Sequence, residues 1–278
     1  PDYAEAYSNM GIALNGIIFK KPNRDLQTII VSLLDKKLYV RPNNITAAAI
    51  SLLKFEPSLK KHLKFVSYNT EIQNPLDIIS DLDKLPLLRK LMSVCLLPDL
   101  ELEKLFKQLR ASILKNISLF KETSPELLRF QSALALQCFT NEYVYSQSKN
   151  EDKAIKVLEE KIKELLSKGE QPSPLIILIL ASYKALHNYE WCQSLIVTNQ
   201  IQDVFTRIFE EPNQEEKLKM NLPILEEISD KVSSNVREQY EKNPYPRWVN
   251  FGLKLEPVPI SKVVEELELS HFYKKINE

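Results

Sequence analysis

The segment from Tyr240 to Trp248 combines aromatic rings, prolines and an arginine directly after a helical pattern. Its two prolines hold the residues before them in extended geometry, so the rings project from a stiff segment that loses little entropy on binding. The guanidinium of Arg247 can grip a carboxylate through two parallel hydrogen bonds. The candidate contact residues of this aromatic strap, residues 240–248, are Tyr240, Asn243, Tyr245, Arg247 and Trp248. The strap fits two roles: a lid that lines a neighbouring ligand site, or a rigid linker that fastens two domains together.

A second group of polar and aromatic residues follows an apolar stretch in the middle of the chain. Residues 134–139 have the pattern of a buried helix, and Asn141, Glu142, Tyr143 and Tyr145 come soon after them. Side chains gathered at a helix end in this way can line a pocket or a domain contact. The same pattern also fits a polar last turn whose tyrosines cover the core.

Few of the side chains that catalysis or metal binding requires are present. His187, Glu190 and Cys192 lie close together, but a helix would place Cys192 off the face that the other two share, and zinc needs a third and usually a fourth ligand. The spacings typical of serine hydrolases, dithiol oxidoreductases and zinc peptidases do not occur. We therefore expect no catalytic residue and no metal site in this chain.

Glycine is scarce in this sequence. Only Gly11, Gly16, Gly169 and Gly252 occur, and none belongs to a glycine-rich loop that could cradle a phosphate. Nucleotide and S-adenosylmethionine sites on Rossmann-like sheets need glycines, because the backbone must turn tightly and approach the ligand. The sequence therefore predicts that no complete cofactor domain of this kind lies within the chain.

Composition predicts a soluble globular protein with no strong electrostatic field. The chain has 278 residues, of which 44% are hydrophobic and 27% charged, and its 37 basic residues balance its 37 acidic ones. A net charge of zero disfavours nucleic acid and anionic membranes as partners. Cys95, Cys138 and Cys192 each lie in an apolar helical pattern, as buried thiols do in a reducing compartment, which favours the cytoplasm. The longest apolar run, residues 175–182, is too short to span a bilayer.

The elements that position these residues are predicted to be helices. From Asp25 to about residue 235, apolar residues recur every three to four positions, which gives each helix one apolar stripe. Strand-like pieces are limited to residues 38–40 and 64–66. We expect an all-α fold, an irregular multi-helix domain. Helix starts are predicted near Asp25, Pro42, Pro57, Pro75, Asp99, Ser124, Glu151, Pro174 and Asn213, and a last helix from Ser261 to about Ile276.

The first residues resemble the first helix of a tetratricopeptide repeat. Tyr7, Met10, Gly11 and Leu14 match the aromatic, large, glycine and large positions of that pattern over about a dozen residues. A single repeat cannot bury its own face. The match therefore implies a truncated array or a capping turn, and the opening on Pro1 favours truncation.

The repeat-like opening, the segment 136–144 and the segment 236–248 together resemble bacterial tetratricopeptide-repeat proteins fused to a class I S-adenosylmethionine-dependent methyltransferase. The resemblance implies repeats upstream and a Rossmann-like transferase downstream. It implies S-adenosylmethionine as the cofactor of the parent protein, and no cofactor within this chain. The cofactor residues of that family have no counterpart here, so none is assigned.

This resemblance gives a working division of the chain. Residues 1–20 would be the remnant of a repeat, residues 21–235 a helical middle domain, and residues 236–278 the strap, a linker and a helix leading into the catalytic domain. The expected function is to link a protein-binding repeat array to that domain and help shape its substrate site. The alternative is a stand-alone helical scaffold that binds a peptide or a partner protein.

Overall fold

The computed structural model describes residues 4–36, 40–69, 71–120, 124–220 and 230–242, together with the single residues 259 and 261. Within these ranges the chain is helical and contains no strand, so the all-α prediction is confirmed. Residues 64–66 lie inside a helix, which corrects the expectation of a strand there. The predicted helix at 261–276 lies, except for Ser261, outside the described residues.

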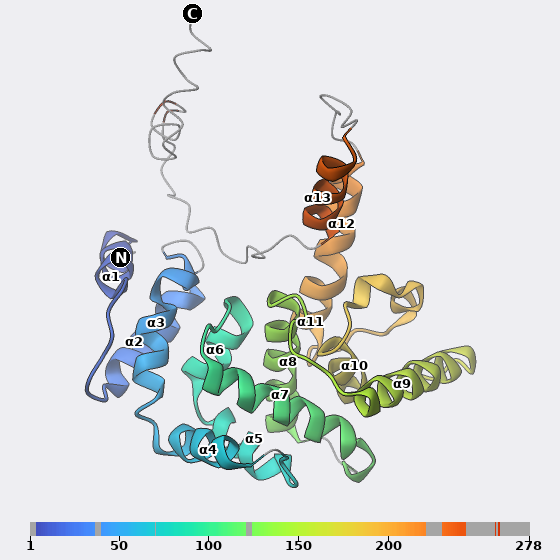
Figure 1. Cartoon of the computed structure of the whole chain (residues 1–278), viewed down its shortest axis with the longest axis horizontal. Helices are drawn as coiled ribbons and strands as arrows, with labels where there is room; N and C mark the ends of the chain where they lie inside the picture. Colours follow the sequence, from blue (N-terminus) through green and yellow to red (C-terminus); the bar gives the residue numbers. More distant parts are fainter. Residues whose placement is uncertain are drawn as a thin grey trace, which may run out of the picture.

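Thirteen α-helices follow one another along the described ranges (Figure 1). They are α1 (Ala4–Leu14), α2 (Arg24–Asp35), α3 (Pro42–Leu53), α4 (Pro57–Tyr68), α5 (Pro75–Asp83), α6 (Pro86–Val94), α7 (Leu100–Lys115), α8 (Pro125–Thr140), α9 (Lys149–Ser167), α10 (Pro174–Ala181), α11 (Gln202–Phe205), α12 (Glu211–Lys219) and α13 (Lys231–Lys242). Short 3₁₀ turns occur at η1 (Ile117–Leu119), η2 (Leu186–Asn188) and η3 (Glu190–Ser194), and a π turn at η4 (Thr206–Glu210).

Proline and polar caps set most of the helix starts. A proline occupies one of the first two positions of α3, α4, α5, α6, α8 and α10, where its missing N–H is not needed. Asn23, Asn74, Asp99 and Ser124 accept hydrogen bonds from the first turns of α2, α5, α7 and α8. Most predicted starts are therefore confirmed to within a residue or two.

One helix begins two residues before its predicted start, and one predicted start is wrong. Helix α9 begins at Lys149 because Ser148 and Glu151 form a capping box: the Ser148 N–H donates to Glu151 Oε2 at 2.8 Å, and the Glu151 N–H donates to Ser148 Oγ at 3.3 Å. The start expected near Asn213 is wrong, because α11, η4 and α12 form one continuous helical rod from Gln202 to Lys219.

The central helix of the fold is α8. It packs against α5, α6, α10 and α11, and only a few of its side chains reach the surface. Gln131, fully buried in α8, donates through Nε2 to the Leu178 carbonyl at 3.2 Å and to Ser182 Oγ at 3.3 Å. The core therefore surrounds α8, and the C-terminal end of this helix is held in a fixed position.

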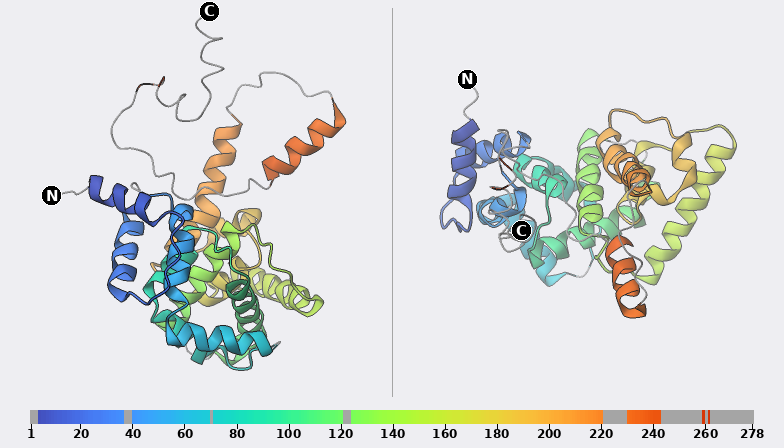
Figure 2. Two further views of the ribbon diagram at one scale, coloured as in Figure 1. Left: turned by 60° about the vertical axis from the view of Figure 1, so that its left-hand side comes forward. Right: turned by 90° about the horizontal axis from the view of Figure 1, so that it is seen from above.

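The two ends of the described chain lie at the margins of this core. Helix α1 packs against α3 at one edge, with Leu14 buried and Tyr7 and Met10 partly buried. Helices α12 and α13 extend beyond the compact body (Figures 1 and 2). Tyr240 lies in α13, so the strap begins as helix rather than as extended chain, while residues 243–248 lie outside the described residues.

Candidate functional site

A pocket of about 730 Å³ opens at the C-terminal end of α8. Its walls come from α3, from the loop between α6 and α7, from α7, from the end of α8 and the turn that follows it, and from α13. We call it the helix-end pocket. Its lining residues are Asn43, Thr46, Leu96, Leu97, Pro98, Glu103, Gln137, Asn141, Glu142, Val144, Tyr145, Gln239 and Tyr240.

The turn after α8 has an unusual backbone. The N–H of Glu142 donates to the Phe139 carbonyl at 3.1 Å and that of Tyr143 to the Cys138 carbonyl at 2.8 Å, which is the pattern of a Schellman C-cap. Glu142 and Tyr143 have φ of 55° and 56°, the left-handed region that glycine normally occupies. Each costs roughly 1–2 kcal/mol relative to the right-handed conformation. Strain of this size, held at the rim of a pocket, is typical of functional sites.

Arg110 holds the residues that directly follow this turn in place. Its side chain, 1% exposed, donates to the carbonyls of Tyr145 at 3.2 Å, Ser146 at 3.3 Å and Ser182 at 3.4 Å. The guanidinium also lies 4.1 Å from the centre of the Tyr183 ring. Because three backbone carbonyls from two segments converge on one cation, the chain around Tyr145 has little freedom to move.

The amide of Asn141 is the most unusual polar group in the pocket wall. The residue is 5% exposed, and neither its Oδ1 nor its Nδ2 has a hydrogen-bond partner among the described residues. The amide is close enough to Tyr145 to oppose the rise that burial causes in the pKa of that hydroxyl. A buried amide without good hydrogen bonds costs free energy, so this position is not explained by stability.

Neighbouring polar groups in the wall are, by contrast, satisfied. Thr46 Oγ1 donates to the Pro42 carbonyl at 2.9 Å. With its amide oriented so that the nitrogen faces acceptors, Gln137 donates to the carbonyls of Cys95 at 3.1 Å and Met92 at 3.2 Å. These two residues therefore support the wall, whereas the polar neighbour that affects the Asn141 amide is the Tyr145 hydroxyl.

Among the described residues, the charges that line the pocket are negative. Glu103 from α7 and Glu142 from the turn after α8 contribute carboxylates, and the lining residues that the structure describes include no lysine, arginine or histidine. Glu103 is half-buried and forms no ion pair with another described residue. The pocket therefore favours cations and hydrogen-bond donors over anions.

The structure brings together some of the residues singled out in the sequence and separates others. The same pocket is lined by Asn141, Glu142 and Tyr240. Asn141 and Tyr240 are about 100 residues apart in the sequence. Tyr143 points away from it, because its hydroxyl donates to the Ala181 carbonyl at 3.2 Å and its ring packs edge-on against Phe139. The remaining strap candidates, Asn243, Tyr245, Arg247 and Trp248, lie outside the described residues.

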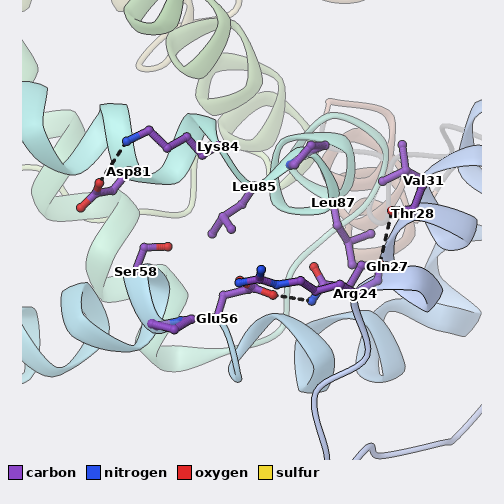
Figure 3. A pocket seen from close by; sticks show the side chains of 12 residues that line it. Arg24, Gln27, Thr28, Val31, Glu56, Ser58, Asp81, Lys84, Leu85 and Leu87 are labelled. Carbon is purple, nitrogen blue, oxygen red and sulfur yellow. Dashed lines mark hydrogen bonds and ion pairs between the residues drawn. The ribbon is translucent and has the colours of Figure 1, made fainter.

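A second pocket, of about 510 Å³, lies between α2, α4, α5 and α6 (Figure 3). Here the charges are already paired. Glu56 accepts from Arg24 at 3.3 Å and from Gln27 at 2.9 Å, while Lys84 lies 3.5 Å from Asp81. This pocket therefore has the chemistry of a packing gap between helices rather than of a binding site.

No group of His, Cys, Asp or Glu side chains in the described ranges could hold a metal ion. None of the helices in those ranges has the length and apolar composition needed to cross a bilayer. Comparison with models of protein families, with curated proteins and with solved structures gave no match.

Proposed function

We propose that this chain is the non-catalytic helical region of a tetratricopeptide-repeat methyltransferase that uses S-adenosylmethionine. In this proposal it joins a protein-binding repeat array to the catalytic domain, and the helix-end pocket is its contribution to substrate recognition. One observation carries the proposal: Asn141 and Tyr240, from two of the three segments on which the resemblance depends, line a single pocket. A pocket at a domain junction is a common place for a ligand to bind.

Isothermal titration of S-adenosylmethionine into this chain tests the non-catalytic part of the proposal. We expect no heat of binding, because no glycine-rich loop is present to approach the cofactor. Stoichiometric binding by the chain alone would overturn the proposal.

The recognition part is tested in the parent protein that contains this chain. Tyr240→Ala should reduce turnover at least tenfold while leaving the helical circular dichroism unchanged, because Tyr240 is 67% exposed and contributes little to the core. Tyr68→Ala is the matched control, since Tyr68 is 80% exposed on α4 and does not line the pocket. Equal turnover by the two variants would contradict a role for the pocket.

A stand-alone scaffold that binds a protein segment is the second candidate. The two candidates are separated by measuring partner binding with and without a catalytic domain. If the domain makes no difference, the scaffold function is supported.

A further inference from the structure

We infer that the helix-end pocket receives a basic side chain, lysine or arginine, presented by an extended segment of a protein partner. The inference rests on the proposed function, since it names the chemistry of the ligand for the same pocket. Charge, unsatisfied hydrogen bonding, apolar lining and size each support it independently.

Glu103 contributes a negative charge to the pocket wall. The two buried carboxylates of the described chain are paired: Asp83 lies 3.1 Å from Arg89, and Glu56 lies 3.3 Å from Arg24. Glu103 is half-buried without such a pair. It lies in the first turn of α7, but the half charge of a helix N-terminus does not cancel a full carboxylate charge. A cation supplied by a partner would complete this pair.

The end of α8 adds to the same field. A helix C-terminus carries a partial negative charge, and the α8 terminus at Thr140 is followed directly by two pocket residues, Asn141 and Glu142. Phosphate and carboxylate ligands are therefore disfavoured here. A cationic group is favoured by the helix terminus and by Glu103 together.

Asn141 provides an observation that does not depend on charge. Its amide is more than nine-tenths buried, lines the pocket and has no hydrogen-bond partner among the described residues. Oδ1 can accept from an ammonium or guanidinium group, and Nδ2 can donate to a peptide carbonyl. A peptide that carries a basic side chain offers both partners, whereas a free metal ion offers no acceptor for the amide nitrogen.

The remaining lining matches the stem of such a side chain. Lysine and arginine have long apolar stems that pack on apolar surface while their charged ends reach polar groups. Leu97, Pro98 and Val144 offer apolar surface, and Tyr240 offers an aromatic ring that attracts cations, whereas the Tyr145 ring already faces the guanidinium of Arg110 at 5.8 Å. A volume of about 730 Å³ exceeds what one side chain fills, which leaves room for the flanking backbone.

Three peptides test the inference directly on the unmodified chain. They are blocked pentapeptides of alanine whose central residue is lysine, norleucine or glutamate, and binding is followed by chemical-shift changes of the side-chain amides of Asn141 and Gln239. We expect the lysine peptide to bind at least tenfold more tightly than the norleucine peptide, and the glutamate peptide not to bind. Equal binding of lysine and norleucine peptides, preference for glutamate, or no binding by any of the three would overturn the inference.

A pair of matched variants then locates the interaction. Glu103→Gln should weaken binding of the lysine peptide about tenfold, whereas Glu160→Gln, an exposed position on α9 outside the pocket, should leave it unchanged. If both variants bind equally well, the assignment of Glu103 fails. If Tyr240→Ala also lowers turnover of the parent protein in that case, the proposed function stands without this inference. If Tyr240→Ala has no effect either, both fail.

Discussion

The guanidinium of Arg110 lies 4.1 Å from the centre of the Tyr183 ring, although α7 and the segment after α10 are about 70 residues apart in sequence. The same guanidinium donates to the carbonyls of Tyr145, Ser146 and Ser182. This single side chain therefore ties the turn after α8 to the core. The position of the helix-end pocket depends on it, because Tyr145 is part of the pocket wall.

Arg110→Met should lower the free energy of unfolding by about 3–5 kcal/mol, because it leaves two buried carbonyls and one partly buried carbonyl without their donor. Urea denaturation followed by circular dichroism measures the change. Arg24→Met is the matched control: the Arg24 side chain is 78% exposed in its ion pair with Glu56, and such pairs contribute less than about 1 kcal/mol. If the two variants lose similar free energies of unfolding, the hydrogen bonds of Arg110 contribute no more to stability than an exposed ion pair.

Glu142 directly follows the C-cap residue Asn141, at the C′ position where glycine is preferred, and has φ of 55°. Glu142→Gly should therefore be more stable than Glu142→Ala by about 1 kcal/mol, since both remove the carboxylate and only alanine keeps the strained Cβ. At Glu160, an exposed position inside α9, the order should reverse by a similar amount, because glycine is unfavourable within a helix. Thermal or urea denaturation of the four variants gives both differences. The same order at both sites would contradict the strain argument.

His62 and Asp81 form a pH-dependent contact between α4 and α5, with 3.0 Å between Nε2 and Oδ2. The hydrogen bond from His62 holds the pKa of the Asp81 carboxyl below its ordinary value. A lowered folded-state pKa stabilises the protein above the ordinary pKa of about 4, and this contribution is lost as the pH falls through the folded-state value. Wild type should therefore exceed Asp81→Asn in stability, by less than about 1 kcal/mol at pH 7, and the difference should shrink as the pH falls below the ordinary carboxyl pKa of about 4. If the stability difference between wild type and Asp81→Asn increases as the pH is lowered, the contact does not stabilise the ionised form of Asp81.

The three cysteines provide a simple test of burial. Cys95 and Cys138 are 2% and 0% exposed, and burial raises the pKa of Cys95 to about 12 and that of Cys138 to about 11. Burial likewise raises the pKa of Cys192 to about 12. At pH 8 a thiol reagent should modify none of them in the folded protein and all three after unfolding, because only the exposed thiolate reacts. Modification of one thiol at the rate of free cysteine would place that residue outside the core.

Local signals in the sequence predicted the helices well where a proline or a polar cap began them. The start of α6 at Pro86 was not predicted, because α5 ends only three residues earlier and the apolar patterns of the two helices run together. The start expected near Asn213 was wrong for a different reason. The π turn at Thr206–Glu210 allows the helical rod to continue through Pro212, where an ordinary α-helix would end.

The site was predictable only in part. Asn141 and Glu142 stood out because polar residues follow a buried helix, and Tyr240 because it begins an aromatic and proline-rich segment. Glu103 and Thr46 carried no signal, since each lies on a helix of ordinary pattern and reaches the pocket only through packing between helices. Long-range placement of this kind is not encoded in local spacing.

Asn141→Leu should separate stability from recognition. Leucine has a similar size and removes a buried amide that has no hydrogen-bond partner among the described residues, so the free energy of unfolding should rise by about 1 kcal/mol. Asn116→Leu is the matched control, because Asn116 caps α7 at a similar backbone conformation but donates to the Ser112 carbonyl at 2.8 Å.

The control variant should lose about 1 kcal/mol of stability, the contribution of one hydrogen bond. Only Asn141→Leu should lose binding of the lysine peptide, because only Asn141 lines the pocket. Urea denaturation and chemical-shift titration of the two variants measure both effects. If Asn141→Leu is destabilised as much as the control and still binds the peptide, the Asn141 amide serves the fold. A more stable protein that no longer binds would show that this amide is kept for a ligand at the expense of stability.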